Sequence, residues 1–152
     1  MTFTEEQIKE ILKKAIPKEI DVSVTRQRRV MIKVLRENLI KVIKVIAKEM
    51  DTFHLSTITA RDTGTDLEIL YHFFINGILV TVRTSCPRDD PTIDSILKVF
   101  PSAVLYEREI HDLLGIIPKG HPDLRPLVLP DDWKEGYPLR KDWKPSGGDA
   151  SF

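Results

Sequence analysis

Apolar residues recur every three or four positions in four stretches of the chain, which is the spacing of one face of a helix. The first stretch opens with Thr4-Glu5-Glu6, a capping sequence, and stops before Pro17. In the second stretch the helical period outweighs the β-branched content, which would favour a strand. The sequence therefore predicts helices over residues 4–15, 36–50, 92–100 and 102–114.

Elsewhere apolar and polar positions alternate, which is typical of strands that bury one face. Such alternation on either side of Gln27 predicts two short strands, with the apolar positions Val22, Val24, Val30, Ile32 and Val34. Three further runs cover residues 53–60, 67–75 and 78–85. Asn76-Gly77 separates the last two runs, and an Asn-Gly pair predicts a tight hairpin because both turn residues need positive φ.

The order of these elements is helix, strands, helix, three strands, then helices, which predicts an α+β fold. We expect a single, mostly antiparallel sheet with the helices packed on one face. Seven of the ten prolines lie from Pro101 onward, and after Pro118 the residues show no period. Such a stretch suits neither a helix interior nor a central strand. The sequence therefore predicts an α+β domain over residues 1–117 and an extended, proline-rich docking tail over residues 118–152.

The composition is that of a globular chain with balanced charge. Of the 152 residues, 41% are hydrophobic and 30% are charged, with 23 basic and 23 acidic side chains. A net charge of zero gives no overall attraction to nucleic acid or anionic lipid. No stretch approaches the roughly 18 apolar residues of a membrane span, and the first residues lack the apolar core of a signal peptide. If this chain works at a membrane, we expect partner proteins to hold it there.

The cysteine and amide content adds two indications. Cys86 is the single cysteine, so this chain cannot supply the ligands of an iron–sulfur cluster or a structural zinc site. We expect Cys86 to be a buried thiol without a redox role. Gln and Asn are scarce while Glu, Lys, Arg and Ile are plentiful, a bias typical of proteins from thermophiles.

The segment from Tyr106 to Ile116 is a highly charged predicted helix. It places Glu107 with His111, and Arg108 with Asp112, four residues apart. Its apolar positions form the expected buried stripe, which would leave the charged side chains together on the exposed side. The glycine at its end is suited to a helix C-cap. One face of this helix is therefore expected to be available to another molecule.

Three proline-bearing blocks follow this helix, and they read His121-Pro122-Asp123-Leu124-Arg125, Leu129-Pro130-Asp131-Asp132-Trp133 and Pro138-Leu139-Arg140-Lys141-Asp142-Trp143. Proline-stiffened segments lose less conformational entropy on docking, and Trp and Arg are the side chains that most often anchor interfaces. The aromatic residues of this region have no evident place in a domain core. A groove on a partner protein would bury them.

The charged helix and these blocks resemble a known signature. The run Glu-Arg-Glu-x-x-Asp-x-x-Gly-Ile, then Gly-His-Pro-Asp-Leu-Arg and Gly-x-Pro-Leu-Arg-Lys-Asp-Trp, is similar to the signature of the 30 kDa subunit of respiratory complex I and of its relatives in energy-converting membrane-bound NiFe hydrogenases. The matching blocks span Tyr106 to Trp143. The short form of the chain and the block at 129–133 resemble the hydrogenase-type and archaeal relatives more closely, which makes NADH and quinone less expected as substrates of the whole complex.

The resemblance implies a non-catalytic accessory subunit on the hydrophilic arm of a membrane-bound oxidoreductase. Such a subunit lies against the large, hydrogenase-like (49 kDa-type) subunit, accompanies a small iron–sulfur subunit and meets the membrane subunits only indirectly, on the cytoplasmic side of the cell membrane. It binds no cofactor, because iron–sulfur clusters, and in hydrogenases a Ni-Fe site, belong to its partners. We expect no nucleic-acid partner, because the net charge of the chain is zero. The residues expected to dock the partner are Glu107, Arg108, Glu109, Asp112, His121, Asp123, Arg125, Trp133, Arg140, Asp142 and Trp143.

Two other interpretations use the charged residues differently. A stand-alone metal-dependent hydrolase would draw its ligands and its acid–base groups from Glu107, His111, Asp112 and His121. The ten-residue interval between its two histidines matches no common metal-ligand spacing. An RNA-binding module would use the basic run at residues 26–29, but the zero net charge of the chain disfavours it.

Overall fold

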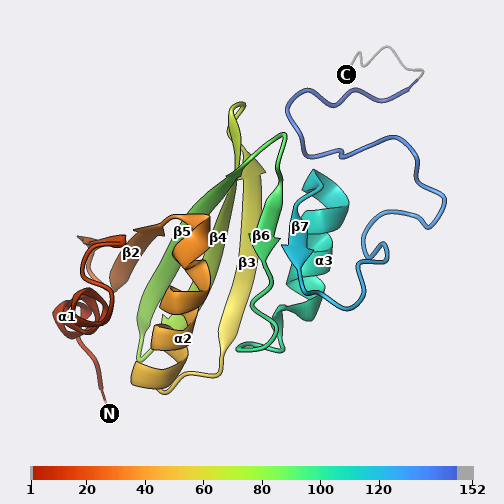
Figure 1. Cartoon of the computed structure of the whole chain (residues 1–152). Coiled ribbons are helices and arrows are strands. Elements are labelled where there is room, and N and C mark those ends of the chain that lie inside the picture. Colours follow the sequence, from red (N-terminus) through yellow and green to blue (C-terminus); the bar gives the residue numbers. More distant parts are fainter. Residues whose placement is uncertain (1, 147–152) are drawn as a thin grey trace.

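The computed structural model describes residues 2–146, and Figure 1 shows how their elements are arranged. In chain order the elements are α1 (Glu5–Ala15), β1 (Ile20–Arg26), β2 (Arg29–Val34), the single 3-10 turn η1 (Arg36–Asn38), α2 (Leu39–Glu49), β3 (Leu55–Asp62), β4 (Asp66–Ile75), β5 (Ile78–Pro87), β6 (Thr92–Asp94), α3 (Ala103–Leu114) and β7 (Ile117–Lys119).

A five-stranded sheet is the frame of the fold. Its strand order is β1-β2-β5-β4-β3, and every neighbouring pair is antiparallel except β2 and β5, which run parallel. Strands β6 and β7 pair in parallel as a separate two-stranded sheet. The predicted α+β class with one main, mostly antiparallel sheet is confirmed, and the small second sheet is an addition to it.

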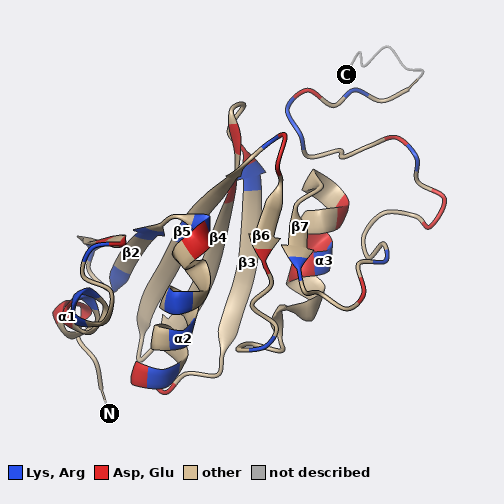
Figure 2. Cartoon of the chain, in the orientation of Figure 1, with Lys and Arg blue, Asp and Glu red and all other residues tan. Residues whose placement is uncertain are grey.

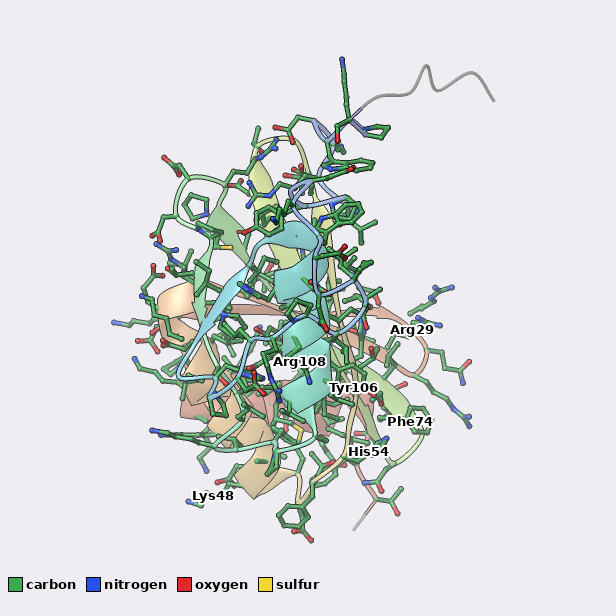
Figure 3. The ribbon with its side chains drawn as sticks, turned by 90° about the vertical axis from the view of Figure 1, so that its right-hand side faces the viewer. Arg29, Lys48, His54, Phe74, Tyr106 and Arg108 are labelled. Carbon is green, nitrogen blue, oxygen red and sulfur yellow. The ribbon has the colours of Figure 1, made fainter. Side chains whose placement is uncertain are left out.

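The core lies between one face of the large sheet and the elements that cover it. Alternate side chains of β4 are buried in this core, namely Leu67, Ile69, Tyr71, Phe73 and Ile75. In the side view of Figure 3, Lys48 of α2 lies on one side of the ribbon, whereas Arg29 and Phe74 project on the opposite side. Helix α2 therefore covers the face of the sheet opposite to the one that carries Phe74.

The first helix and the hairpin turn form where the local sequence predicts them. Thr4 caps α1 through a reciprocal pair of hydrogen bonds with Gln7: the Gln7 amide donates to Thr4 Oγ1 at 3.3 Å, and the Thr4 amide donates to Gln7 Oε1 at 2.9 Å. Asn76 and Gly77 both have positive φ, at 50° and 82°, as a two-residue turn between twisted strands requires. Both predictions are confirmed.

The predicted helix over residues 92–100 is wrong. Thr92–Asp94 form strand β6 instead, because they pair with Ile117–Lys119 some 25 residues later in the chain, with Thr92 opposite Ile117. A single turn follows, in which the Phe100 amide donates to the carbonyl of Ile96 at 2.8 Å. The apolar side chains Ile93, Ile96 and Phe100 are buried all the same. Their spacing fits a short strand followed by one turn as well as it fits a helix.

Cys86 is a buried thiol, as predicted. It lies in β5 with 1% of its surface exposed, and its Sγ is 3.8 Å from the carbonyl oxygen of Leu67. Burial raises the pKa of the Cys86 thiol to about 11. The thiol is therefore protonated and unreactive at neutral pH.

Candidate partner-docking segment

The chain continues after β7 without another helix or strand up to residue 146, and we call residues 121–146 the strap. In Figure 1 the strap, drawn in blue, leaves the end of β7 and passes along the outside of α3. The described part of this predicted docking tail lies against the domain, because it is hydrogen-bonded to it at several points. The predicted boundary between residues 117 and 118 falls inside β7.

The carboxylate of Asp112 holds the first part of the strap. Asp112 lies in the last turns of α3 and is buried, with 8% of its surface exposed. The backbone amides of Leu127, Val128 and Leu129 all donate to its Oδ2 oxygen, at 3.1, 2.8 and 2.8 Å. Three consecutive amides aimed at one oxygen form a small anion-binding nest. The strap backbone supplies the positive end of this interaction and Asp112 the negative end.

A second buried carboxylate, Asp62 at the end of β3, holds the last part of the strap. The Lys141 amide donates to Asp62 Oδ2 at 2.9 Å, and the Gly64 amide donates to Oδ1 at 2.8 Å. Arg88 lies 3.3 Å from the same Asp62 Oδ2 and 2.7 Å from Asp142 Oδ1, so it joins the domain to the strap. Burial raises the pKa of the Asp62 carboxyl, but these amides and the Arg88 charge outweigh the burial, and the pKa is lowered overall.

The strap also contacts the end of α3 between these two carboxylates. The Leu139 amide donates to the carbonyl of Leu113 at 3.1 Å, and Arg140 Nε donates to the carbonyl of Leu114 at 2.7 Å. These bonds satisfy carbonyls at a helix end, where intrahelical donors are missing. Gly115 caps the helix with φ of 74°, and a Cβ at this position would lie only 2.5 Å from Tyr137 Cε2. The cap glycine therefore also makes room for the strap.

Glu107 and Asp112 are not on an exposed side of α3, and this part of the prediction is wrong. Glu107 has 1% of its surface exposed; its Oε1 accepts the Ile96 amide at 2.8 Å and its Oε2 accepts the Ser95 hydroxyl at 2.7 Å. Burial raises the pKa of the Glu107 carboxyl, and these two hydrogen bonds offset only part of that rise. The predicted pairing of Glu107 with His111 is replaced by bonds to the loop that follows β6.

Of the other charged residues of the predicted set, Arg108 contacts the strap, Glu109 is exposed on α3, and the rest belong to the strap. Arg108 donates from Nε and Nη2 to the carbonyls of Arg125 and Pro126, at 3.0 and 2.9 Å. His121 donates from Nε2 to the Val104 carbonyl at 3.0 Å. Arg125 forms a forked ion pair with Asp123, and this pair lowers the pKa of Asp123 to about 2.

The two tryptophans of the strap pack on each other. The rings of Trp133 and Trp143 stack with 6.2 Å between their centroids, and their indole N–H groups donate to the carbonyls of Gly136 and Glu135. Arg140 lies 4.9 Å from the centroid of the Tyr137 ring, in a cation–π contact. These contacts give the distal strap a fixed local shape without a helix or strand.

Apolar side chains project from this fixed backbone into solvent. The exposed fractions are 40% for Leu127, 55% for Val128, 55% for Leu139 and 39% for Tyr137. Acidic and basic residues are interspersed along the same segment (Figure 2). These exposed apolar side chains, which we call the apolar strip, are interspersed with charged residues, and protein-binding surfaces have this composition.

The four residues of the hydrolase hypothesis do not converge on one point. Glu107 binds the loop after β6, His111 donates from Nδ1 to the Ile116 carbonyl, and Asp112 and His121 have the partners given above. Within residues 2–146, no group of three or more His, Cys, Asp or Glu side chains is placed to hold a metal ion. The geometry gives this hypothesis no support.

Sequence reasoning missed Asp62 and Arg88 as residues that bind the strap. Asp62 lies on the same side of β3 as Ile58 and Ala60, which is the side that faces the core. An acidic residue at such a position is unusual, and it could have indicated that Asp62 has a buried partner. The burial of Glu107 could have been predicted from the spacing of Ala103, Glu107, Ile110 and Leu114, which places all four on one face of a helix. This face of α3 is buried.

The fold and the strap together define a class of protein: a small α+β domain that carries an extended segment fixed to its surface. Residues 32–149 match the family described as respiratory-chain NADH dehydrogenase, 30 Kd subunit. The chain therefore belongs to the family of the 30 kDa subunit of respiratory-chain NADH dehydrogenase. The resemblance seen in residues 106–143 is confirmed.

Two relatives illustrate the range of this family. A subunit of the F(420)H(2) dehydrogenase of Methanosarcina mazei is 40% identical over 95 residues, which is 60% of this chain and 60% of that protein. A subunit of the NADH-quinone oxidoreductase of Streptomyces coelicolor is 35% identical over 121 residues, which is 74% of this chain and 47% of that protein. The matches thus span less than two thirds of the length of these curated relatives.

Two solved structures share the fold. A chain in the structure of the membrane-bound sulfane sulfur reductase, an archaeal respiratory membrane complex, superposes with a TM-score of 0.80 and 28% identity, covering 92% of this chain and 85% of that one. The trypsin-resistant fragment of Nqo5 superposes with a TM-score of 0.64 and 26% identity, covering 77% of this chain and 98% of that fragment. Among residues 2–146, no helix is long and apolar enough to cross a membrane.

Proposed function

We propose that this chain is a non-catalytic accessory subunit of a membrane-bound, multi-subunit oxidoreductase of the hydrogenase or complex I type. It lies on the hydrophilic arm and braces the large catalytic subunit beside the electron-transfer path. The observation that carries the proposal is the strap, which holds exposed Leu127, Val128 and Leu139 on a backbone fixed to the domain. A strip of this kind is best explained by a protein surface that covers it.

The similarities to known proteins support this proposal at two points. The family is that of a subunit of a respiratory enzyme, and one chain of the same fold comes from an archaeal respiratory membrane complex. In this proposal the iron–sulfur clusters, and any Ni-Fe site, belong to partner subunits. A large 49 kDa-type subunit and a small iron–sulfur subunit are the expected neighbours, and the chain is held peripherally on the cytoplasmic side of the membrane through them.

The proposed docking residues divide into two groups by their positions. Glu109, Trp133, Arg125, Asp123, Asp142 and Trp143 lie at or near the surface, where a partner can reach them. Glu107, Arg108, Asp112, His121 and Arg140 bind the chain's own backbone. We propose that the first group contacts the partner directly and that most of the second supports the surface from within.

A co-purification experiment tests the proposal. The chain is expressed with the products of its neighbouring genes, and a tag on the chain is used for purification. We expect a large subunit and an iron–sulfur subunit to be retained. The triple variant L127S/V128S/L139S should retain about tenfold less of the large subunit, because the three serines remove apolar area that the partner would bury, and tenfold corresponds to about 1.4 kcal/mol.

The matched control is F53S, which removes an exposed apolar side chain outside the strap. Phe53 is 81% exposed and precedes β3. The F53S variant should leave the retention of the large subunit unchanged. Recovery of the wild-type chain alone, or equal retention by the triple variant and the wild type, would count against the proposed function.

A further inference from the structure

The two carboxylates that hold the strap are buried, although the strap itself is exposed. Asp112 and Asp62 have 8% and 5% of their surfaces exposed. Burying a carboxylate is costly unless hydrogen bonds or a countercharge compensate for it. At Asp112 three amides compensate for the burial, and all three come from the strap. At Asp62 one of two amides comes from the strap, and Arg88 adds a charge.

The hydrogen bonds also set the direction of the strap side chains. Because the amides of Leu127, Val128 and Leu129 all turn inward to one oxygen, the local backbone has little freedom to rotate. Leu127 and Val128 are left 40% and 55% exposed by this arrangement. At the distal end, the Lys141 amide on Asp62 and the Leu139 amide on Leu113 fix the backbone around Leu139, which is 55% exposed.

We propose that Asp112 and Asp62 are positioning residues that form the docking surface before the partner arrives, so that the strap binds the large subunit as a fixed surface and does not fold upon it. This inference rests on the proposed function and adds the residues on which its docking surface depends. A segment that is already ordered does not lose its conformational entropy at the moment of binding. The affinity therefore depends on the fraction of molecules in which the strap is in place.

The first test is the series Asp112→Asn and Asp112→Ala, made in the full chain. Alanine removes the acceptor but favours helix, so α3 should persist. Asparagine keeps an oxygen and loses the charge, so its effect should be intermediate. The control is Glu10→Ala, which removes an exposed acid on helix α1, outside the strap.

Two quantities are measured on each variant: amide hydrogen exchange at residues 127–129, and the dissociation constant for the co-expressed large subunit. In the wild type and in Glu10→Ala we expect slow exchange and tight binding. In Asp112→Ala we expect fast exchange and binding weakened by about 30-fold, corresponding to a docked strap in roughly one molecule in thirty. Unchanged affinity in a variant whose residues 127–129 exchange quickly would overturn the inference.

A synthetic peptide of residues 118–146 supplies an independent test. It contains every proposed contact of the strap but neither carboxylate. We expect the peptide to displace the full chain from the large subunit only at concentrations at least tenfold higher than those at which added full chain does so. Displacement at the same concentrations would overturn the inference. The proposed function fails in a different way, because then neither the wild type nor Glu10→Ala retains the large subunit.

Discussion

Glu107 is the residue at which burial and ionisation oppose each other most clearly. Its carboxyl receives hydrogen bonds from Ser95 and Ile96, yet it has 1% of its surface exposed and no ion pair among the described residues. Burial is the largest influence on it and raises its pKa. Its role in the fold is to hold the loop after β6 against α3. The two hydrogen bonds favour the charged carboxylate, but burial outweighs them.

The variant Glu107→Gln tests this view through the pH dependence of stability. A raised pKa in the folded state means that the favourable contribution is complete below the unfolded pKa near 4.5 and is lost as the pH rises through the folded pKa. Glutamine cannot ionise, so the melting temperature of the variant should rise relative to that of the wild type as the pH is raised from 4.5 to 8. Circular dichroism melts over this range measure the difference.

The control for this variant is Glu109→Gln, an exposed position on the same helix. Its melting temperature should follow that of the wild type over the same pH range. A constant difference between Glu107→Gln and the wild type would show that ionisation of Glu107 does not affect stability.

Gly115 combines a backbone demand with a steric one, and Gly115→Ala should reveal both. A residue with a Cβ in the left-handed region costs about 1–2 kcal/mol. The Cβ would also meet Tyr137 at 2.5 Å. Gly77→Ala is the matched control, because its φ of 82° is similar and no atom lies within 4 Å of the added Cβ.

Both variants should lower the free energy of unfolding, but only Gly115→Ala should also release the strap, as measured by proteolysis within residues 121–146. Adding Tyr137→Ala to Gly115→Ala should recover the part of the loss that comes from the clash. No recovery in this double variant would contradict the role given to Tyr137.

At the scale of elements, the sequence predicts structure well where the determining contacts are local. The Thr4 cap, the Asn76-Gly77 turn and the alternation of β4 depend on residues a few positions apart, and all appear as expected. The stretch 92–100 depends on a strand that begins at Ile117, and a local period cannot reveal such a partner. The strap contacts of Asp62 and Asp112 were missed for the same reason, since Lys141 lies 79 residues beyond Asp62.

For the whole molecule, the strap contributes less to the core than to the surface. Truncation after Gly120 should leave the domain folded, because within residues 2–146 the buried apolar residues all precede this point. The truncated chain loses the amide donors of Asp112 and one of those of Asp62, so its melting temperature should fall by several degrees. It should also fail to retain the large subunit. Circular dichroism checks the fold, and an unfolded spectrum would show that the strap is part of the core.

The bonds of the two buried carboxylates also have a consequence for biosynthesis. Ribosomes make Asp62 and Asp112 before they make the amides at 127–129 and 141 that these side chains accept. Domains begin to fold from the N-terminus while translation continues. The sheet can therefore assemble on a nascent chain, whereas the proposed docking surface is complete only after residue 141 has emerged. If the proposed function holds, unfinished copies of this subunit lack that surface, and only finished copies compete for a place in the complex.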